Sequence, residues 1–205
     1  MILVTGGTGL VGAHLLLHLI ESRNNASEKI RAIYRTMESI EKTRSLFRLY
    51  NKITLFDFIE WVKADIIDVP SLESAFVGIS KVYHCAAIIS FDPKDEQKIR
   101  KINIEGTANI VNFCLNYNIQ KLCYVSSIAA LGDLAAHETI ITEETEWNPE
   151  KPHSDYAISK YGAEMEVWRG QQEGLWVTIV NPGVILGSGF WDSGSGLLFT
   201  QVAKG

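Results

Sequence analysis

The first twenty residues join a short apolar run to a glycine-rich turn and then to a stretch without helix breakers. Residues 1–4 read Met-Ile-Leu-Val, residues 5–12 read Thr-Gly-Gly-Thr-Gly-Leu-Val-Gly, and residues 13–20 are mostly apolar. This order predicts a buried strand that passes through a tight turn into a helix. The glycines therefore lie at a strand-to-helix junction.

A junction of this kind is suited to bind phosphate groups. Backbone N–H groups at the beginning of a helix have no partner inside the helix and carry the positive end of its dipole. A diphosphate can lie against them if no Cβ atom blocks its approach, and glycine has none. The residues that we expect to form this dinucleotide site are Gly6, Gly9, Leu10, Val11 and Gly12. The alternative is a turn that merely tolerates glycine.

The composition is that of one globular α/β domain. Hydrophobic residues make up 46% of the 205 residues and charged residues 21%, which is ordinary for a globular protein. The net charge of −5 argues against nucleic acid as a partner, because a phosphate backbone binds to basic surfaces. No apolar run has the length of a membrane span, and no basic leader precedes the first strand. The three cysteines form no metal-binding pattern, so we expect a cytoplasmic protein with reduced thiols and no metal.

Apolar runs and helix-favouring segments alternate along the rest of the chain. The expected strands after the first are residues 30–35, 59–66, 81–87, 121–127 and 175–180, and the expected helices after the first are residues 37–50, 71–76, 95–116 and 154–172. Ser71 is expected to cap the second of these helices, and residues 21–29 and 131–154 are expected to be loops. Apolar strands joined by right-handed crossovers predict a doubly wound parallel sheet, a Rossmann fold of three α/β/α layers.

A second group of residues carries chemistry that a nucleotide-binding fold alone does not specify. Tyr156 and Lys160 stand four residues apart, on one face of a helix, where an ammonium group stabilises a phenolate and lowers the tyrosine pKa. Tyr156 is therefore the candidate general acid or base. Tyr117 and Lys121 have the same spacing, but a helix ends and a strand begins between them. Ser127 ends the fifth strand, at the edge where such sheets bind ligands.

Together these motifs resemble the extended short-chain dehydrogenase/reductases. The first three are Thr5-Gly6-x-x-Gly9-x-x-Gly12, Ser126-Ser127 at the end of the fifth strand and Tyr156-x-x-x-Lys160. Further matches are Asp65-Ile66, His84-x-Ala86-Ala87, Asn103-x-x-Gly106-Thr107 and Asn181-Pro182-Gly183. The resemblance covers nearly the whole chain. Within the family, residues 30–35 and 126–130 look closer to dihydroflavonol-reductase-like and 3β-hydroxysteroid-dehydrogenase-like members than to nucleotide-sugar epimerases.

The resemblance implies a role for each catalytic candidate. Ser127 would polarise the substrate carbonyl or hydroxyl group, and Tyr156 would transfer the proton. Lys160 would lower the pKa of Tyr156 and donate a hydrogen bond to the nicotinamide ribose, while the nicotinamide ring exchanges hydride with the substrate carbon. His84 is expected to be a strand-end residue with structural hydrogen bonds, and the cysteines are expected to fill the core.

The resemblance also implies which residues surround the adenine end of the dinucleotide. Asp65 would accept a hydrogen bond from the adenine amino group, and Ile66 would pack on the ring. Ala86 and Ala87 would line the cofactor where larger side chains collide with it. The structural alternative for Asp65 is a residue that simply ends a strand.

The resemblance also implies contacts at the nicotinamide end of the cofactor, from side chains and from the backbone. Asn103 would be a hydrogen-bonding group on a helix near the cofactor, with a solvated helix position as its alternative. For Ser126, packing and a hydrogen bond toward the cofactor are equally open. The backbone of Pro182, Gly183 and Val184 would face the carboxamide group.

The end of the second strand indicates which dinucleotide binds. NAD sites place an acid there for the adenosine ribose, and NADP sites accommodate the additional phosphate with a base. Tyr34 occupies the acidic position, and Arg35 follows it. A guanidinium group binds a phosphate through two hydrogen bonds, and no carboxylate repels that phosphate here. NADP is therefore favoured over NAD, with Arg35 as its ligand. The alternative is that Arg35, like Lys42 and Arg44, is an ordinary solvated residue.

These inferences lead to one main hypothesis and two alternatives. The main hypothesis is an NADP-dependent oxidoreductase that transfers hydride between nicotinamide and a small-molecule ketone or alcohol. The first alternative is an NAD-dependent nucleotide-sugar epimerase or dehydratase. The second is a cofactor-binding sensor or scaffold without turnover, against which the intact Ser127, Tyr156 and Lys160 argue. A homodimer is left open.

The C-terminal residues are expected to begin a second structural unit. We divide the chain into a dinucleotide-binding domain at residues 1–183 and the beginning of a substrate-binding lobe at residues 184–205. Members of the family continue further, which predicts a truncated chain that binds cofactor and turns over weakly or not at all. Phe190 and Trp191 are then expected to be exposed aromatic residues, with contact to the substrate as the alternative. A helix is expected to begin at about Gly196.

Overall fold

The computed structural model describes residues 1–22, 28–135, 138–192 and 194–204. Most of the loop expected at 21–29, and residues 136–137 of the loop expected at 131–154, lie outside the described residues. Within the described ranges, no helix combines the length and the hydrophobicity that a membrane crossing requires.

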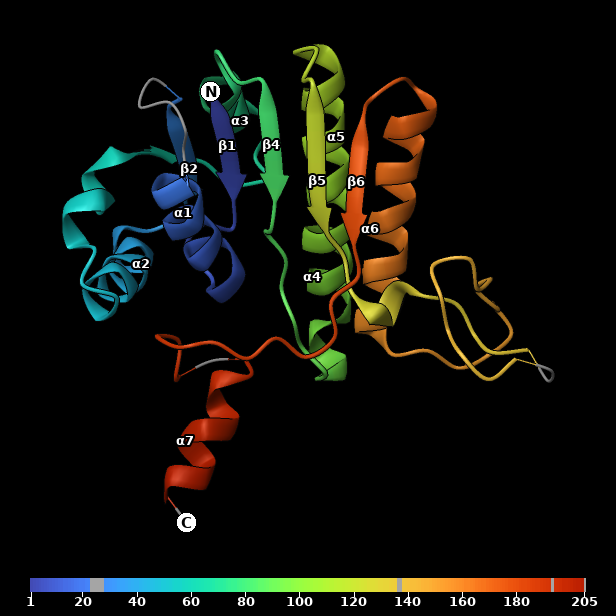
Figure 1. The fold of residues 1–205 in the computed structure, drawn as a ribbon. Coiled ribbons are helices and arrows are strands. Elements are labelled where there is room, and N and C mark those ends of the chain that lie inside the picture. Colours follow the sequence, from blue (N-terminus) through green and yellow to red (C-terminus); the bar gives the residue numbers. More distant parts are fainter. Residues whose placement is uncertain (23–27, 136–137, 193, 205) are drawn as a thin grey trace.

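A six-stranded parallel sheet forms the centre of the molecule, in the order β3-β2-β1-β4-β5-β6 (Figure 1). Its strands are β1 (Ile2–Thr5), β2 (Ile30–Tyr34), β3 (Ile59–Lys63), β4 (Lys81–His84), β5 (Lys121–Val125) and β6 (Val177–Val180). The chain first builds outward from β1 to β3 and then returns to the other side of β1. This is the order of a doubly wound sheet, so the predicted Rossmann fold is confirmed. Its crevice lies where the order reverses, at the carboxyl ends of β1 and β4.

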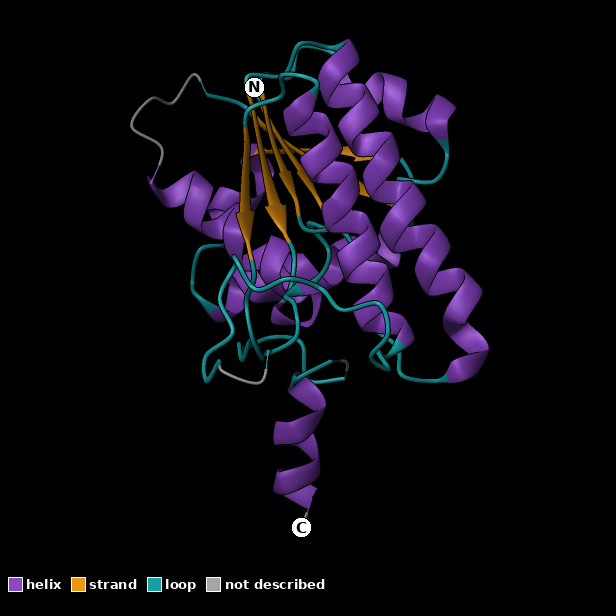
Figure 2. Cartoon of the chain, turned by 90° about the vertical axis from the view of Figure 1, so that its right-hand side faces the viewer, coloured by secondary structure: helices purple, strands orange, loops and turns teal. Residues whose placement is uncertain are grey.

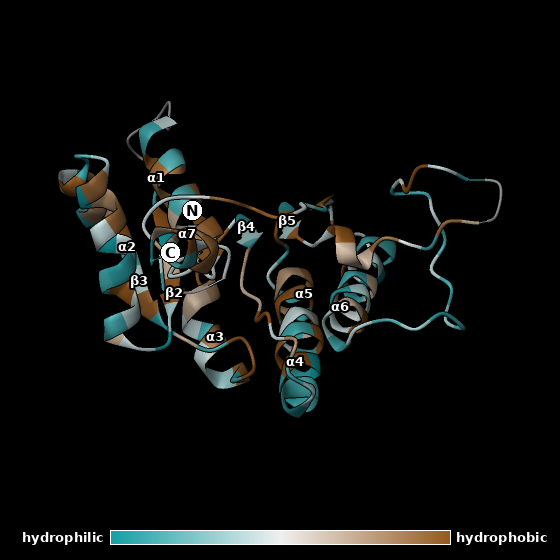
Figure 3. Cartoon of the chain, turned by 90° about the horizontal axis from the view of Figure 1, so that it is seen from below, coloured by the Kyte–Doolittle hydropathy of each residue, from teal (hydrophilic) through white to brown (hydrophobic). Residues whose placement is uncertain are grey.

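Helices cover both faces of the sheet (Figures 2 and 3). The helices are α1 (Leu10–Ser22), α2 (Met37–Leu49), α3 (Val69–Phe76), α4 (Glu96–Arg100), α5 (Gly106–Asn116), α6 (Asp155–Gln172) and α7 (Gly196–Lys204). Successive side chains of a strand point to opposite faces, and β1 shows the result. Ile2 and Val4 pack into a core with α1 and α2, whereas Leu3 packs into a second core with α3, α5 and α6.

Four strands end earlier than their apolar runs predict, namely those expected at 30–35, 59–66, 81–87 and 121–127. The apolar residues beyond the strand ends are buried by other means. Ile66, for example, is buried in the core of the α3, α5 and α6 face although it has left β3. Apolar runs therefore overestimate the length of strands at the carboxyl edge, because the crevice and the helices also bury side chains there.

The helix expected at 71–76 begins earlier than predicted. It starts at Val69, with Asp68 at the N-cap position and Pro70 in the first turn, where the missing proline N–H has no partner to lose. The prediction of a Ser71 cap was therefore wrong. The Ser71 hydroxyl instead donates to the carbonyl oxygen of Asp68 at 2.7 Å and accepts from the backbone N–H of Asp65 at 3.0 Å.

The single helix expected at 95–116 contains a break in its regular geometry. Between α4 and α5 lies a π-helical turn, Lys101–Glu105, which holds the buried Asn103. π-helical turns are rare and occur frequently at functional sites. The periodicity of apolar residues indicates a helix here but does not distinguish the π turn from the α-helical turns beside it.

The segment after β6 runs beneath the carboxyl ends of the strands to α1 and α2 (Figure 1). Phe190 is 4% exposed and packs with Ala13 and Leu46 of these helices. The expectation of an exposed Phe190 was therefore wrong, whereas Trp191 is 47% exposed. Gly189 has a φ of 90°, and a Cβ atom there would lie 2.8 Å from the Leu46 side chain. The predicted helix near residue 196 is confirmed as α7.

One buried arginine joins β2 to the end of α3. The guanidinium group of Arg31 donates hydrogen bonds to the carbonyl oxygens of Ser74, Ala75 and Val77 at 2.9–3.2 Å and to the Glu60 carboxylate at 2.8 and 3.1 Å. These carbonyl groups lie at or beyond the last turn of the helix, where no backbone N–H reaches them. Arg31 therefore completes the hydrogen bonding of the C-terminus of α3.

We expect Arg31→Met to lower the free energy of unfolding by about 2–4 kcal/mol, because several buried acceptors lose their donor. Urea unfolding followed by circular dichroism measures the change. Arg48→Met is the matched control, since Arg48 is exposed on α2 and its nearest acid, Glu41, is 4.0 Å away. The control is expected to change stability by less than about 0.5 kcal/mol. Equal midpoints for both variants would contradict the role of Arg31.

Candidate functional site

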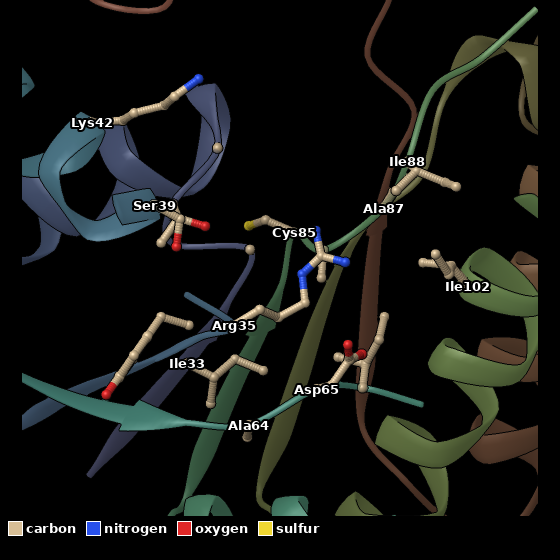
Figure 4. A pocket seen from close by; sticks show the side chains of 16 residues that line it. Ile33, Arg35, Ser39, Lys42, Ala64, Asp65, Cys85, Ala87, Ile88 and Ile102 are labelled. Carbon is tan, nitrogen blue, oxygen red and sulfur yellow. The ribbon is translucent and has the colours of Figure 1, made fainter. Parts of the chain in front are cut away.

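A groove of about 320 Å³ opens at the carboxyl edge of the sheet, where the strand order reverses (Figure 4). Of the residues predicted to bind cofactor, the groove is lined by Gly6, Gly9, Arg35, Asp65, Ile66, Ala86 and Ala87. These residues come from the ends of four different strands and from the turn before α1. The fold thus brings together positions that lie far apart in the sequence.

The three glycines of the first turn have three different physical roles. Gly6 has a φ of 67°, and a Cβ atom there would lie 2.6 Å from the backbone nitrogen of Ala86. At Gly12 a Cβ atom would lie 2.2 Å from the carbonyl oxygen of Gly6. At Gly9 the nearest atom would be 3.5 Å away, so the protein itself does not require glycine there. Gly6 and Gly12 are needed by the fold, whereas at Gly9 the absence of a side chain leaves the groove open. Leu10 and Val11 follow it in the first turn of α1.

Asp65 and Ile66 lie at one end of the groove. The Asp65 carboxylate accepts a hydrogen bond from the backbone N–H of Ile67 at 3.2 Å, which fixes the turn after β3. Ile66 is 4% exposed and touches the backbone of α5 at Gly106, where a Cβ atom would come within 2.5 Å of its side chain. The turn therefore presents an acceptor and an apolar side chain to the groove.

Arg35 extends its guanidinium group into the same groove (Figure 4). It makes no hydrogen bond or ion pair with the other residues that the structure describes. Ser39 and Lys42 of α2 line the groove beside it, and the sequence alone left Lys42 as an ordinary solvated residue. The Lys42 ammonium group also pairs with Asp192 at 2.9 Å. The positions of Ser39 and Lys42 in the sequence could have indicated that they line the groove, because both lie in the first two turns of α2, which begins two residues after Arg35.

Ser127 and Tyr156 meet at the carboxyl edge next to β5. Ser127 caps a short 3₁₀ turn, Ile128–Ala130, by accepting from the backbone N–H of Ala129 at 3.1 Å. Tyr156 lies in the first turn of α6, whose N-cap Ser154 accepts from Ala157 at 3.1 Å. The Ser127 side chain lies close enough to the Tyr156 hydroxyl group to lower the pKa of this tyrosine. Two capped helical turns thus hold the two candidate catalytic hydroxyl groups together.

The ionisation of Tyr156 differs from the expectation. Burial raises the pKa of Tyr156 above its usual value, and the nearby Ser127 side chain offsets this in part. The expectation that Lys160 lowers this pKa was wrong for this arrangement, because the ammonium group is held elsewhere. It donates to the Tyr124 hydroxyl at 2.8 Å and to the Val125 carbonyl oxygen at 3.0 Å. The spacing along α6 places Tyr156 and Lys160 on one face but does not make them partners.

Lys160 is almost completely buried, with 1% of its surface exposed. Burial lowers the pKa of Lys160 to about 8, although the nearby Glu164 carboxylate acts in the opposite direction. Glu164 accepts hydrogen bonds from Ser126 and Asn181, and Asn181 also donates to the carbonyl oxygen of Ser127 at 3.1 Å. Ser126 therefore has a protein partner, which agrees with the packing interpretation of this residue.

The Asn103 side chain bonds to protein atoms on three sides. It donates to the Ile88 carbonyl oxygen at 3.0 Å and to the Ser159 hydroxyl at 3.0 Å, and it accepts from the backbone N–H of Ile88 at 2.9 Å. Ile88 lines the groove but Asn103 does not. Asn103 therefore shapes the groove through the segment after β4, rather than facing it directly.

The remaining predicted residues lie outside the groove as the structure has it. Pro182, Gly183 and Val184 follow β6 and do not line it; the carbonyl oxygen of Pro182 accepts from the backbone N–H of Ile128 at 3.1 Å. Cys85, expected to fill the core, does line the groove. Among the described residues there is no cluster of three or more metal-ligating side chains.

The chain is similar in sequence to two reductases and in fold to an epimerase. Over 190 residues the chain is 33% identical to a putative dihydroflavonol 4-reductase of Synechocystis sp., which covers 92% of this chain and 50% of that protein. Over 197 residues it is 32% identical to anthocyanidin reductase of Arabidopsis thaliana, which covers 90% and 55%. UDP-glucuronic acid 4-epimerase from Bacillus cereus, solved in complex with NAD, has the same fold with a TM-score of 0.76 at 21% identity, over 99% of this chain and 62% of that one.

The chain spans about half the length of the curated relatives it matches. The sequence profile of the 3-beta hydroxysteroid dehydrogenase/isomerase family matches residues 3–186, a stretch that includes the glycine turn, Ser127, Tyr156 and Lys160. The relatives are reductases of the kind that the sequence motifs resemble. The chain therefore belongs to the 3-beta hydroxysteroid dehydrogenase/isomerase family, within the extended short-chain dehydrogenase/reductases.

Proposed function

We propose that this chain is an NADP-dependent oxidoreductase that transfers hydride between nicotinamide and a ketone or alcohol substrate. The observation that carries the proposal is the proximity of the Ser127 and Tyr156 side chains at the edge that also holds the glycine-lined groove. The two curated relatives, named as reductases of flavonoid substrates, support the same reaction class. The substrate is expected to be a small molecule.

The residues of the groove fit a dinucleotide. The open position at Gly9 leaves room for a diphosphate close to the first turn of α1. Asp65 and Ile66 offer an acceptor and an apolar surface for an adenine, and the small Ala86 and Ala87 leave space along the path toward β5. The charge and shape of this groove support a nucleotide cofactor without requiring a metal ion.

The proposed chemistry assigns separate tasks to the two hydroxyl groups. Ser127 donates a hydrogen bond to the substrate carbonyl oxygen and so polarises the bond that is reduced. Tyr156 gives its proton to that oxygen as negative charge develops there. When bound, the reduced nicotinamide supplies the hydride. Because the pKa of Tyr156 is raised, the hydroxyl is protonated at neutral pH, as reduction of a ketone requires.

The basic groups of the groove support NADP rather than NAD. Arg35, Lys42 and Ser39 lie at the end where the adenosine ribose is expected, and Tyr34 replaces the usual acid. A 2′-phosphate there gains charge-assisted hydrogen bonds and meets no carboxylate from β2.

We expect Arg35→Ala to weaken NADPH binding by about tenfold while changing NADH binding by less than about twofold, since one charge-assisted hydrogen-bond pair to the 2′-phosphate is lost. Titration calorimetry with both coenzymes measures the two affinities. Arg48→Ala, at an exposed position of α2, is the control. Equal losses for the two coenzymes, or none for either, would remove the phosphate role of Arg35.

The alternative is an NAD-dependent nucleotide-sugar epimerase or dehydratase. The UDP-glucuronic acid 4-epimerase structure, solved with NAD, shares the fold, and the fold alone is compatible with both reactions. An epimerase would retain its cofactor through purification and consume no added NADPH, whereas a reductase would oxidise NADPH in the presence of ketones. A non-catalytic role would need no paired hydroxyl groups. A homodimer and a cytoplasmic location stay predictions.

A further inference from the structure

We propose that Tyr124 is a positioning residue for Lys160: its buried hydroxyl group holds the lysine ammonium group at the carboxyl edge of the sheet, between β5 and α6. The inference rests on the proposed function in one respect, since it is the nicotinamide ribose that the ammonium group is expected to meet. The placement of Lys160 itself is a property of this chain and can be measured without any cofactor.

The side chains of Tyr124 and Lys160 are in close contact and are shielded from solvent. Tyr124 is 1% exposed and Lys160 is also 1% exposed. The Lys160 ammonium group donates to the Tyr124 hydroxyl at 2.8 Å and lies 4.5 Å from the centre of the tyrosine ring. Its second hydrogen bond goes to the carbonyl oxygen of Val125, the next residue of the same strand. Two acceptors from β5 therefore fix the position of a group on α6, and leave its third N–H for a ligand.

The Tyr124 hydroxyl group is itself held in place by other buried groups. Thr107 of α5 and Ser126 lie beside it, close enough to lower its pKa. The Thr107 hydroxyl is bonded to one ring nitrogen of His84 at 3.0 Å, and the other ring nitrogen is bonded to the Thr5 hydroxyl at 2.6 Å. Burial lowers the pKa of His84 to about 3, so the ring is neutral. A chain of uncharged polar groups thus ties the acceptor of Lys160 to the end of β1, directly before the glycine turn.

The groups that face Lys160 differ in charge. Glu164 of α6 is the carboxylate that favours the charged lysine. Tyr156, also on α6, has a raised pKa and is neutral. From the β4 side come His84, which is neutral, and Cys85, whose pKa burial raises to about 12.

Tyr124, on β5, is neutral as well, because burial raises its pKa. Tyr124 therefore stabilises the charged form of Lys160 only through the dipole of its hydroxyl group, whose oxygen accepts the hydrogen bond. A hydrogen bond that accepts from an ammonium group favours the charged form. Removal of the hydroxyl group must therefore lower the pKa of Lys160 below its present value of about 8.

The test is Tyr124→Phe, which removes the hydroxyl group and keeps the ring. We expect the midpoint of Lys160 titration in the cofactor-free protein to move to lower pH by about one unit, as the loss of one hydrogen bond to a charged group implies. Heteronuclear NMR of the lysine Cε atoms measures this midpoint, with the Lys160 signal assigned by its absence in Lys160→Met. Tyr117→Phe is the control, since Tyr117 packs beside Phe113 at the far end of α5. It is expected to leave the midpoint unchanged.

The second measurement is NADPH affinity against pH. At pH ~6, where Lys160 is charged in both proteins, Tyr124→Phe is expected to bind NADPH within about twofold of the parent protein. As the pH rises, Lys160 deprotonates at a lower pH in the variant, so the variant is expected to begin losing NADPH affinity at a lower pH than the parent does. A merely structural role would lower affinity equally at every pH and leave the Lys160 midpoint in place. An unchanged midpoint would overturn the proposal. A shifted midpoint in a protein that binds no NADPH would uphold the positioning role and defeat the proposed function.

Discussion

Gly9→Ala is expected to weaken NADPH binding by at least about 100-fold, because the new Cβ atom blocks approach to the backbone N–H groups of α1 and two or more charge-assisted hydrogen bonds are lost. The fold is expected to be unaffected. A Cβ atom at this position would meet no protein atom closer than 3.5 Å, and Gly9 has no left-handed φ. Titration calorimetry and urea unfolding on the same preparation measure the two effects.

Gly12→Ala is the matched variant for this prediction. Here the added Cβ atom would lie 2.2 Å from the backbone oxygen of Gly6, with no flexible side chain to give way. We expect a loss of about 2–4 kcal/mol in the free energy of unfolding, of the size that overpacking in a core produces. If Gly9→Ala destabilised the protein as much as Gly12→Ala, or bound NADPH normally, the assignment of Gly9 to the ligand would be wrong.

Tyr156→Phe is expected to reduce NADPH oxidation with ketone substrates by about 100- to 10,000-fold, the usual contribution of a positioned general acid. NADPH affinity is expected to stay within about twofold, because Tyr156 does not line the groove that is proposed to hold the cofactor. Initial rates from NADPH absorbance, together with calorimetry, separate the two effects. A parallel loss of affinity and rate would instead point to a structural role.

The control for this variant is Tyr161→Phe. Tyr161 lies on the same helix and stacks on Trp147, at a ring distance of 4.3 Å. Its hydroxyl group has no place in the proposed chemistry, so the rate is expected to be unchanged. Because both substitutions remove one tyrosine hydroxyl group from α6, any difference between them reports on position alone.

The architecture could be predicted from the sequence because its signals are local. The glycine turn follows an apolar run and precedes a helix without breakers. The alternation of apolar runs and helix-favouring segments then continues along the chain. The placement of Ser127 just after β5 and of Tyr156 and Lys160 on one helix could also be predicted, while their catalytic roles stay predictions. Residues that act through their backbone conformation or their place in a turn leave a pattern in the sequence.

The partners of buried side chains could not be predicted in the same way. Lys160 bonds to Tyr124, which lies on another element, and Asn103 bonds to Ile88 in the segment after β4. Arg31 reaches the end of α3 rather than a neighbour on its own strand. Such pairs depend on how helices pack against the sheet, and no spacing in the sequence encodes that packing. Phe190 was misjudged for the same reason, because its burial depends on α1 and α2.

The crossing of residues 181–192 beneath the sheet affects how rigid the crevice is. The segment is tied at one side by Asn181, which bonds to Ser127 and Glu164, and at the other by Phe190 in its pocket between α1 and α2. Spreading the two halves of the sheet apart would pull this phenyl ring into water, at a cost of about 2 kcal/mol. The crossing segment therefore fixes the width of the crevice before a ligand binds. Binding then costs less conformational entropy, because less of the protein has to become ordered.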